Sequence, residues 1–184
     1  MARPSVVTAA RVVLAGGVVA YPTEAVYGIG CLPDNRRALA RVLAIKRRAA
    51  RKGFLLIAAS VAQIERFAVL PEEPRRSEIL ASWPGPVTWV LEARRGVPKA
   101  LTGGRRTIAV RVTAHPLSQR LCERVGSALV STSANLSGRP PLTSALAVRR
   151  QLGRKVDYVL AGPLGGLDRP TTIRDGATGA VLRA

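Results

Sequence analysis

Positions 46 to 52 bring together cationic side chains that could bind an anion. Five of these seven residues are cationic, among them Lys46, Arg48 and Lys52. Lysine can neutralise a phosphate as a point charge, and arginine can bind two of its oxygens at once. The chain has 25 arginines and only four lysines, two of them here, which indicates a demand for ammonium groups. The alternative is structural, because the dipole of a helix favours cations at its C-terminal end.

A run of small polar residues from 131 to 138 follows the apolar residues 128–130. Ser131, Ser133 and Asn135 offer hydroxyl and amide groups that can approach phosphate oxygens without steric hindrance. We interpret the run as the rim of an anion-binding site. The alternative is a turn in which these side chains bond only to the nearby backbone.

The segment 21–30, YPTEAVYGIG, predicts a strand stopped by proline, then polar groups, then a strand containing two glycines. Folds that combine helices with a sheet bind their ligands at strand ends, which makes Thr23 and Glu24 candidates for ligand contacts. An ordinary proline-containing turn explains the same pattern equally well.

Arg111 alternates with valines at 110 and 112, so it lies in a strand and points away from their face. A strand arginine that does not face solvent needs an anionic partner. Two partners remain open: the carboxylate of a substrate, or one of the 11 acidic residues of the chain. We interpret His115, the single histidine, as the start of the next helix rather than as a base.

Several common mechanisms have no residues to carry them. There is no Walker loop, no GxGxxG that opens a helix, no GxSxG elbow and no nucleophile that can be placed beside the lone His115. Two cysteines 91 positions apart and one histidine are too few for a zinc site. These residues suit a reaction that needs binding and charge neutralisation but no enzyme nucleophile.

The net charge of +18 favours polyanionic partners such as nucleotides or RNA. The strong preference for arginine is also explained by codon bias, so charge alone supports anion binding only weakly. An apolar run at 12–21 resembles a short signal peptide but contains Gly16-Gly17 and is too short to span a bilayer. We expect a cytoplasmic protein with no membrane partner.

Helices and strands alternate along the chain without a linker. Helices are expected at 5–15, 35–47, after Ser60, 75–83, 117–125 and 145–152, and strands at 18–21, 26–31, 54–59, 87–91, 107–112, 128–132, 156–160, 171–174 and 180–182. Asp34 is expected to cap the second helix. The alternation predicts one α/β domain, residues 1–184, with a twisted mixed parallel and antiparallel sheet flanked by helices. Several connections are too short for an all-parallel sheet.

Taken together, these segments resemble the YrdC-like family of threonylcarbamoyl-AMP synthases. The similarity covers nearly the whole chain and includes YPTEAVYGIG, the KxR spacing of Lys46 and Arg48, SWPGPVTWVL, AVRVTAHP, LVSTSANLSG and the closing TTIRD. The KxR spacing together with STSAN is diagnostic of the family. The chain resembles the short bacterial form with a single catalytic domain.

The resemblance implies a nucleotidyltransferase that converts L-threonine, bicarbonate and ATP to L-threonylcarbamoyladenylate and pyrophosphate. The product would feed the threonylcarbamoyl modification of adenosine 37 in tRNAs that read codons beginning with A. Downstream tRNA threonylcarbamoyl-transfer proteins are implied as partners. Mg²⁺ would arrive with the triphosphate, without a metal site made by the protein.

The resemblance also assigns roles to residues. It assigns nucleotide binding to Lys46, Arg48, Lys52, Ser131, Ser133 and Asn135, and a catalytic role to the first two of these. It assigns threonine binding to Thr23, Arg111 and Thr172. Ala49 departs from the family, because many relatives have proline after KxR.

The competing interpretation is a non-enzymatic module of the same fold that binds double-stranded RNA or associates with the ribosome. The net charge would suit it, and direct binding of tRNA or double-stranded RNA is expected to be weak at most. Aromatic residues make up only 4% of the chain, few for base stacking, and no RNA-module motif is present.

Overall fold

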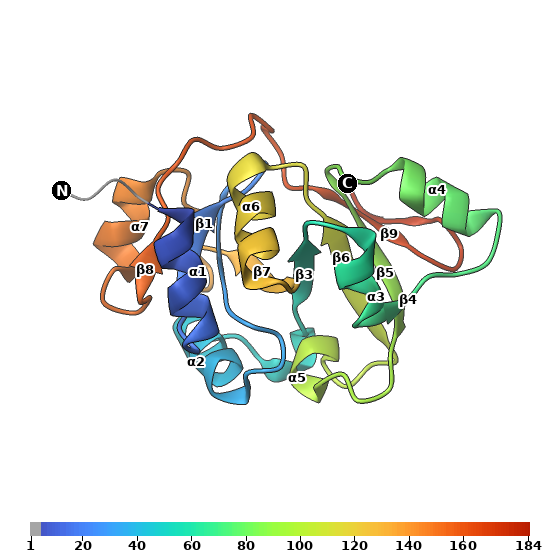
Figure 1. Ribbon diagram of the computed structural model, residues 1–184, viewed down its shortest axis with the longest axis horizontal. Helices are drawn as coiled ribbons and strands as arrows, with labels where there is room; N and C mark the ends of the chain where they lie inside the picture. The colour runs from blue at the N-terminus through green and yellow to red at the C-terminus, as the bar shows by residue number, and fades with distance from the viewer. Residues whose placement is uncertain (1–4) are drawn as a thin grey trace.

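The computed structural model describes residues 5–184, which form one domain around a sheet (Figure 1). The first four residues of the expected domain lie outside the described residues. Within 5–184 the sheet has ten strands: β1 (Val19–Pro22), β2 (Tyr27–Gly30), β3 (Leu55–Ala58), β4 (Ala68–Val69), β5 (Val87–Ala93), β6 (Thr107–Val112), β7 (Leu129–Ser133), β8 (Tyr158–Val159), β9 (Thr172–Asp175) and β10 (Val181–Arg183).

The sheet mixes parallel and antiparallel neighbours, as the short connections predict. Its order is β10-β9-β5-β6-β3-β7-β2-β1-β8, with β4 paired to β5. Three pairs are parallel: β1 with β8, β3 with β6, and β5 with β9. The other neighbours are antiparallel. The predicted mixed α/β fold is confirmed.

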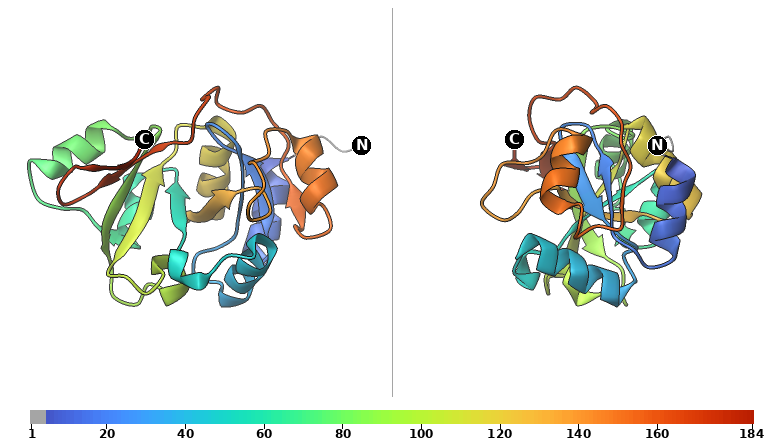
Figure 2. Two further views of the ribbon diagram at one scale, coloured as in Figure 1. Left: turned by 180° about the vertical axis from the view of Figure 1, so that it is seen from behind. Right: turned by 90° about the vertical axis from the view of Figure 1, so that its left-hand side faces the viewer.

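The helices lie on both sides of this sheet (Figures 1 and 2). Within the described residues they are α1 (Val6–Leu14), α2 (Arg36–Lys46), α3 (Val61–Glu65), α4 (Arg75–Ala81), α5 (Lys99–Thr102), α6 (Pro116–Val125) and α7 (Ala145–Leu152), with a short 3₁₀ turn, η1 (Ala50–Lys52). Helices α1 and α6 pack side by side. No helix within 5–184 has the length and apolar character to cross a membrane.

Helix α2 begins one residue later than expected. Asn35, not Asp34, is its N-cap, and the Asn35 Oδ1 accepts a hydrogen bond from the Ala38 backbone N–H over 2.9 Å. An N-cap side chain must reach the N–H two or three positions ahead, and Asn35 has that spacing from the first turn. The prediction for Asp34 was therefore wrong. Ser60 caps α3 and His115 caps α6, as expected.

Alternation along the strands divides the core between two faces of the sheet. In β3, Leu56 and Ala58 pack into the larger cluster, which includes apolar residues of α2 and α7. Ile57, on the opposite face, packs into the cluster formed with α1 and α6. Leu55 lies two residues before Ile57, so its side chain is on the same face of the sheet. There it lines an open pocket. The site therefore lies where strands β3, β6 and β7 extend beyond the helices that cover them.

Candidate active site

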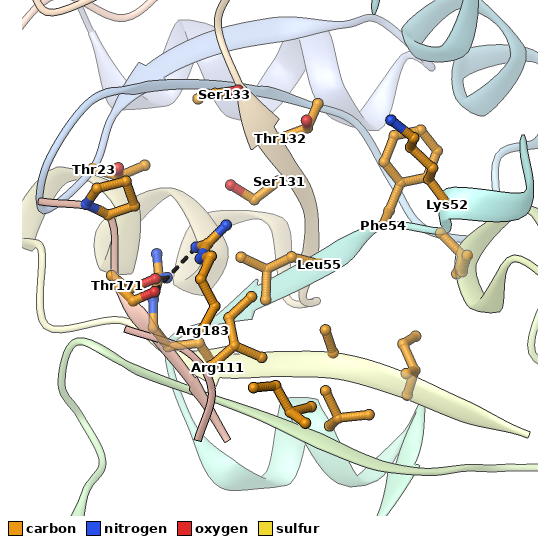
Figure 3. Close-up of a pocket in the computed structure, with 18 of the residues that line it drawn as sticks. Thr23, Lys52, Phe54, Leu55, Arg111, Ser131, Thr132, Ser133, Thr171 and Arg183 are labelled. Atoms are coloured by element: carbon orange, nitrogen blue, oxygen red, sulfur yellow. Dashed lines mark hydrogen bonds between the residues drawn. The ribbon is translucent and has the colours of Figure 1, made fainter. Parts of the chain in front are cut away.

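One pocket of about 600 Å³ collects polar residues from segments far apart in the sequence (Figure 3). Hydroxyl and cationic side chains on its wall come from the β1–β2 loop, the region after α2, the loop before β6, the residue before β9, and strands β6, β7 and β10. These residues are Thr23, Arg48, Lys52, Arg105, Thr107, Arg111, Ser131, Thr132, Ser133, Thr171 and Arg183. Among residues 5–184, no Asp or Glu lines the pocket, so its wall is suited to anions.

The KxR lysine lies behind this wall rather than in it. Lys46 Nζ donates to the carbonyl oxygens of Ser133, over 2.6 Å, and Asn135, over 2.7 Å. It also bonds to Asn135 Oδ1, so its three N–H groups all have partners within the loop after β7. Neither Lys46 nor Asn135 lines the pocket. The pair instead fixes the end of β7, the strand that carries Ser131 and Ser133 to the cavity, and the loop that follows it.

Burial, followed by the charge of Arg48, lowers the pKa of Lys46 to about 8. The helix that carries Lys46 ends in a turn in which Arg47 has a left-handed φ of 44°. That ending turns the chain sharply, so Lys46 stays on the buried face of α2 while Arg48 reaches the pocket. Within the basic run 46–52, Lys46 therefore supports the neighbouring loop, whereas Arg48 lines the pocket.

Arg48 and Lys52 line the end of the pocket near η1. Arg48 Nε donates to the Gly53 carbonyl over 3.2 Å, and its guanidinium lies 5.7 Å from the centre of the Phe54 ring. These contacts hold a planar donor at the pocket wall. Burial, with a smaller effect of Arg105, lowers the pKa of Arg48.

Arg111 forms a buried ion pair at the other end of the pocket. Its Nη2 lies 2.9 Å from Glu24 Oε2, and its Nη1 donates to the Thr171 hydroxyl over 2.7 Å. The sequence left two partners open for Arg111, a substrate carboxylate or an acidic residue of the chain. The structure shows an acidic residue, Glu24, as its partner. Arg111 Nε is buried and has no hydrogen-bond partner among the described residues, so one N–H of this guanidinium is unsatisfied in the structure. Burial lowers the pKa of Arg111.

Thr23 belongs to a tight turn at the same end. Its backbone N–H and its hydroxyl both donate to the Val26 carbonyl, over 3.1 Å and 2.6 Å. The turn is fixed from outside by Ser118, whose hydroxyl donates to the Pro22 carbonyl over 2.5 Å. Since the hydroxyl hydrogen of Thr23 is engaged, its oxygen can act as an acceptor for a ligand.

Thr171, rather than its neighbour Thr172, lines the pocket. Thr172 begins β9 and pairs with Val87, whereas Thr171 directly precedes the strand and bonds to Arg111. Successive residues of an extended chain point to opposite sides, so only one of the two can face the cavity. The structure brings the other predicted residues to the pocket or to the loop behind it.

Two cations that line the pocket, Arg105 and Arg183, were not predicted from the sequence. Arg105 is in the basic loop between β5 and β6, where the two glycines that precede it were the only signal. Arg183 reaches the pocket because the β9–β10 hairpin folds back, and its Nη2 donates to the Thr171 carbonyl over 3.0 Å. No spacing in the sequence indicates that return.

Among the described residues, no group of three or more His, Cys, Asp or Glu side chains could hold a metal ion. In the part of the chain that the structure describes, the pocket wall offers hydroxyl oxygens but no carboxylate, and Arg111 is the one lining cation with an acidic partner. A mixed α/β sheet with such a pocket of cations and hydroxyls defines an anion-binding α/β protein.

The chain belongs to the Sua5/YciO/YrdC family, whose model, described as telomere recombination, matches residues 11–184. A threonylcarbamoyl-AMP synthase from Halorhodospira halophila is 57% identical over 169 residues, 91% of this chain and 88% of that protein. A second, from Nitrosococcus oceani, is 51% identical over 175 residues, 95% of each.

A crystal structure of P. abyssi Sua5 in complex with L-threonine has the same fold. Its TM-score is 0.85 at 35% sequence identity, over 92% of this chain and 50% of the Sua5 chain. The present chain therefore corresponds to about half of that longer protein. The shared fold and the family membership agree with the resemblance that the motifs indicate.

Proposed function

We propose that this protein is a threonylcarbamoyl-AMP synthase, which forms L-threonylcarbamoyladenylate and pyrophosphate from L-threonine, bicarbonate and ATP. The relatives that carry this name match this chain over most of their own length, which favours the enzyme over a non-enzymatic RNA-binding module. The observation that carries the proposal is the pocket itself. Within residues 5–184, it has cations without an acidic partner at one end, Arg48, Lys52 and Arg105, and Arg111, which is paired with Glu24, at the other.

The two ends suit two different substrates. Arg111 lines one end and its guanidinium can attract the carboxylate of threonine, and the Thr23 oxygen can accept a bond from the threonine hydroxyl. Ser131 and Ser133 lie on the wall between this end and Lys52, where the α-phosphate would lie (Figure 3). Lys46 and Asn135 support that wall from behind.

The reaction needs no covalent intermediate with the enzyme. The threonine amine and bicarbonate form a carbamate and water. A carbamate oxygen then bonds to the α-phosphorus, and the bond from phosphorus to the oxygen that bridges to the β-phosphate breaks. Pyrophosphate leaves with that electron pair. Catalysis is then orientation of the two reactants and stabilisation of charge on the phosphates, which Arg48 and Lys52 supply.

Mg²⁺ is proposed to arrive with the triphosphate. Because the pocket wall has hydroxyls and no carboxylates, phosphate oxygens and water would supply most of the ligands. The product is proposed to pass to tRNA threonylcarbamoyl-transfer proteins for modification of adenosine 37. Any direct binding of RNA would come from scattered arginines, so it would be weak and would fall steeply with salt.

The test is pyrophosphate release from ATP by the purified chain, measured with threonine and bicarbonate together and with each one omitted. We expect release only when both are present, together with formation of the adenylate detected by mass spectrometry. Release that is independent of threonine would show a plain ATP pyrophosphatase and overturn the proposal.

A further inference from the structure

The η1 end of the pocket is built by an unusually close contact between two loops. Gly53 and Gly103 have left-handed φ values of 61° and 67°. A Cβ on Gly103 would lie 2.3 Å from the Arg51 carbonyl oxygen, and one on Gly53 would lie 2.6 Å from that of Leu101. Only glycine fits at either position, and this approach of the two backbones brings Arg105 beside Lys52.

Arg105 then shares an acceptor with Arg48. Arg105 donates to the carbonyl oxygens of Arg51, over 2.9 Å, and Lys52, over 3.0 Å. Arg48 Nη2 lies 3.5 Å from the same Lys52 oxygen. Two guanidinium groups therefore lie around one carbonyl oxygen, at the wall of the cavity that both of them line.

These charges have no acidic partner on the protein. Within residues 5–184, no ion pair includes Arg48, Lys52 or Arg105. Arg105 is also one of the groups that lower the pKa of Arg48, as expected for two neighbouring cations. An anion of high charge would relieve this repulsion. Arginine has five N–H donors, and the two carbonyl bonds leave three of them for such a ligand.

We propose that Arg105 is a phosphate-binding residue and that, with Arg48 and Lys52, it forms a subsite for pyrophosphate. The inference rests on the proposed function, in which this subsite holds the β- and γ-phosphates of ATP and then the pyrophosphate that leaves. The opposite end of the pocket is bounded by the Thr23 turn and by Arg111, whose charge is already neutralised by Glu24. The longest and most highly charged part of the nucleotide is therefore directed toward η1.

The test is titration of the full chain with inorganic pyrophosphate by calorimetry, without ATP or threonine. Arg105→Gln should weaken pyrophosphate binding about tenfold or more, through loss of charge-assisted hydrogen bonds. The matched control is Arg106→Gln, which makes the same charge change at the adjacent exposed position outside the pocket. It should bind pyrophosphate within twofold of the wild type.

Arg105 also bonds to the backbone of the turn, so a purely structural role needs its own readout. If Arg105 contacts phosphate, Arg105→Gln should raise the ATP KM while the threonine KM and the affinity for AMP stay within twofold. A joint loss of pyrophosphate, AMP and threonine binding would show a collapsed loop and overturn the proposal. So would pyrophosphate binding by Arg105→Gln within twofold of the wild type, or an equal loss in Arg106→Gln.

The result is separable from the proposed function. Failure of the wild-type chain to release pyrophosphate from ATP would refute the synthase. Failure of Arg105→Gln to alter pyrophosphate binding would refute only the subsite.

Discussion

Arg111 Nη2 lies 2.9 Å from Glu24 Oε2 across 87 positions of sequence, and only 4% and 6% of the two side chains are exposed. Glu24 Oε1 in turn accepts a hydrogen bond from the Thr113 hydroxyl over 2.6 Å. The guanidinium is thereby fixed in one orientation at the wall of the pocket. A substrate carboxylate would meet a positive charge that is already positioned.

Arg111→Ala should raise the threonine KM at least tenfold, and the ATP KM much less, because the carboxylate loses its charged partner. The measurement is pyrophosphate release with each substrate varied in turn. A matched control is Arg36→Ala, which removes an exposed arginine from the start of α2. An unchanged threonine KM in Arg111→Ala would remove this residue from the site.

Glu24→Gln tests the other half of the ion pair. Removing one partner of a buried pair leaves the other charge uncompensated, so we expect a loss of about 3 kcal/mol in the free energy of unfolding. The threonine KM should rise as well, since Arg111 would no longer be held in place. Urea denaturation measures the first effect. Glu92→Gln, at an exposed position of β5, should change neither quantity, and equal stability of the two variants would contradict the argument.

Arg48→Ala should leave the fold intact and reduce kcat/KM for ATP by a factor that corresponds to about 2–4 kcal/mol of transition-state stabilisation. The reason is loss of one charged donor at the phosphate end of the pocket. Circular dichroism checks the fold, and pyrophosphate release checks the rate. Turnover at saturating ATP within twofold of the wild type would assign Arg48 to the solvated end of α2 instead.

Binding of ATP should depend on the charge of Lys46, whose pKa is lowered by burial to about 8. Deprotonation removes a positive charge and one of the three N–H groups that hold the loop after β7. Affinity for a non-hydrolysable ATP analogue should therefore fall about three- to tenfold between pH 7 and pH 9.5. In Lys46→Met the affinity should be low and independent of pH over this range. A flat profile in the wild type would contradict the assignment.

Protonation of Lys46 is expected to favour ATP binding but to lower the stability of the fold. The pKa of Lys46 in the folded chain lies below the ordinary value of 10.5, so the unfolded chain binds the proton more strongly between pH 8 and 10.5. The unfavourable contribution of the buried ammonium is complete below pH 8 and is lost as the pH rises toward 10.5. Lys46→Met should lose this rise in the free energy of unfolding.

Selection among amino acids should follow the hydroxyl more closely than the size of the side chain. Serine keeps the hydroxyl and loses one methyl group, which corresponds to a fall of about 10- to 200-fold in kcat/KM. Valine cannot bond to the Thr23 oxygen, so it should be essentially inactive. Pyrophosphate release with threonine, serine and valine measures both effects. Valine turnover within tenfold of serine would show that Thr23 does not read the hydroxyl.

Much of the local structure could be predicted from the sequence, because it depends on short-range patterns. The apolar stripe of α2 and the alternation of β6 gave those elements near their true bounds. The cap of α2 was misplaced by one residue, since Asp34 and Asn35 both favour the cap position and only the path of the chain decides between them. The KxR and STSAN segments each indicated anion binding from their residue types, and the family resemblance assigned both to one nucleotide site.

The roles within that site were decided by tertiary structure. Lys46 has the same charge as Lys52, but only long-range packing shows that its N–H groups are used by the loop around Ser133 and Asn135. The pairing of Arg111 with Glu24 likewise depends on the approach of β6 to the β1–β2 loop, which no local pattern encodes.

A shift of one residue in the start of a strand explains why Thr171, and not Thr172, faces the pocket. The last strand but one was expected to start at Thr171 and starts at Thr172, and a shift of one residue exchanges the side chain that faces the pocket. Sequence by itself therefore determined the element types, the net charge and the chemical character of the site. The three-dimensional fold decided which cation is free to bind a ligand, because burial and pairing depend on residues brought together from 60 to 90 positions apart.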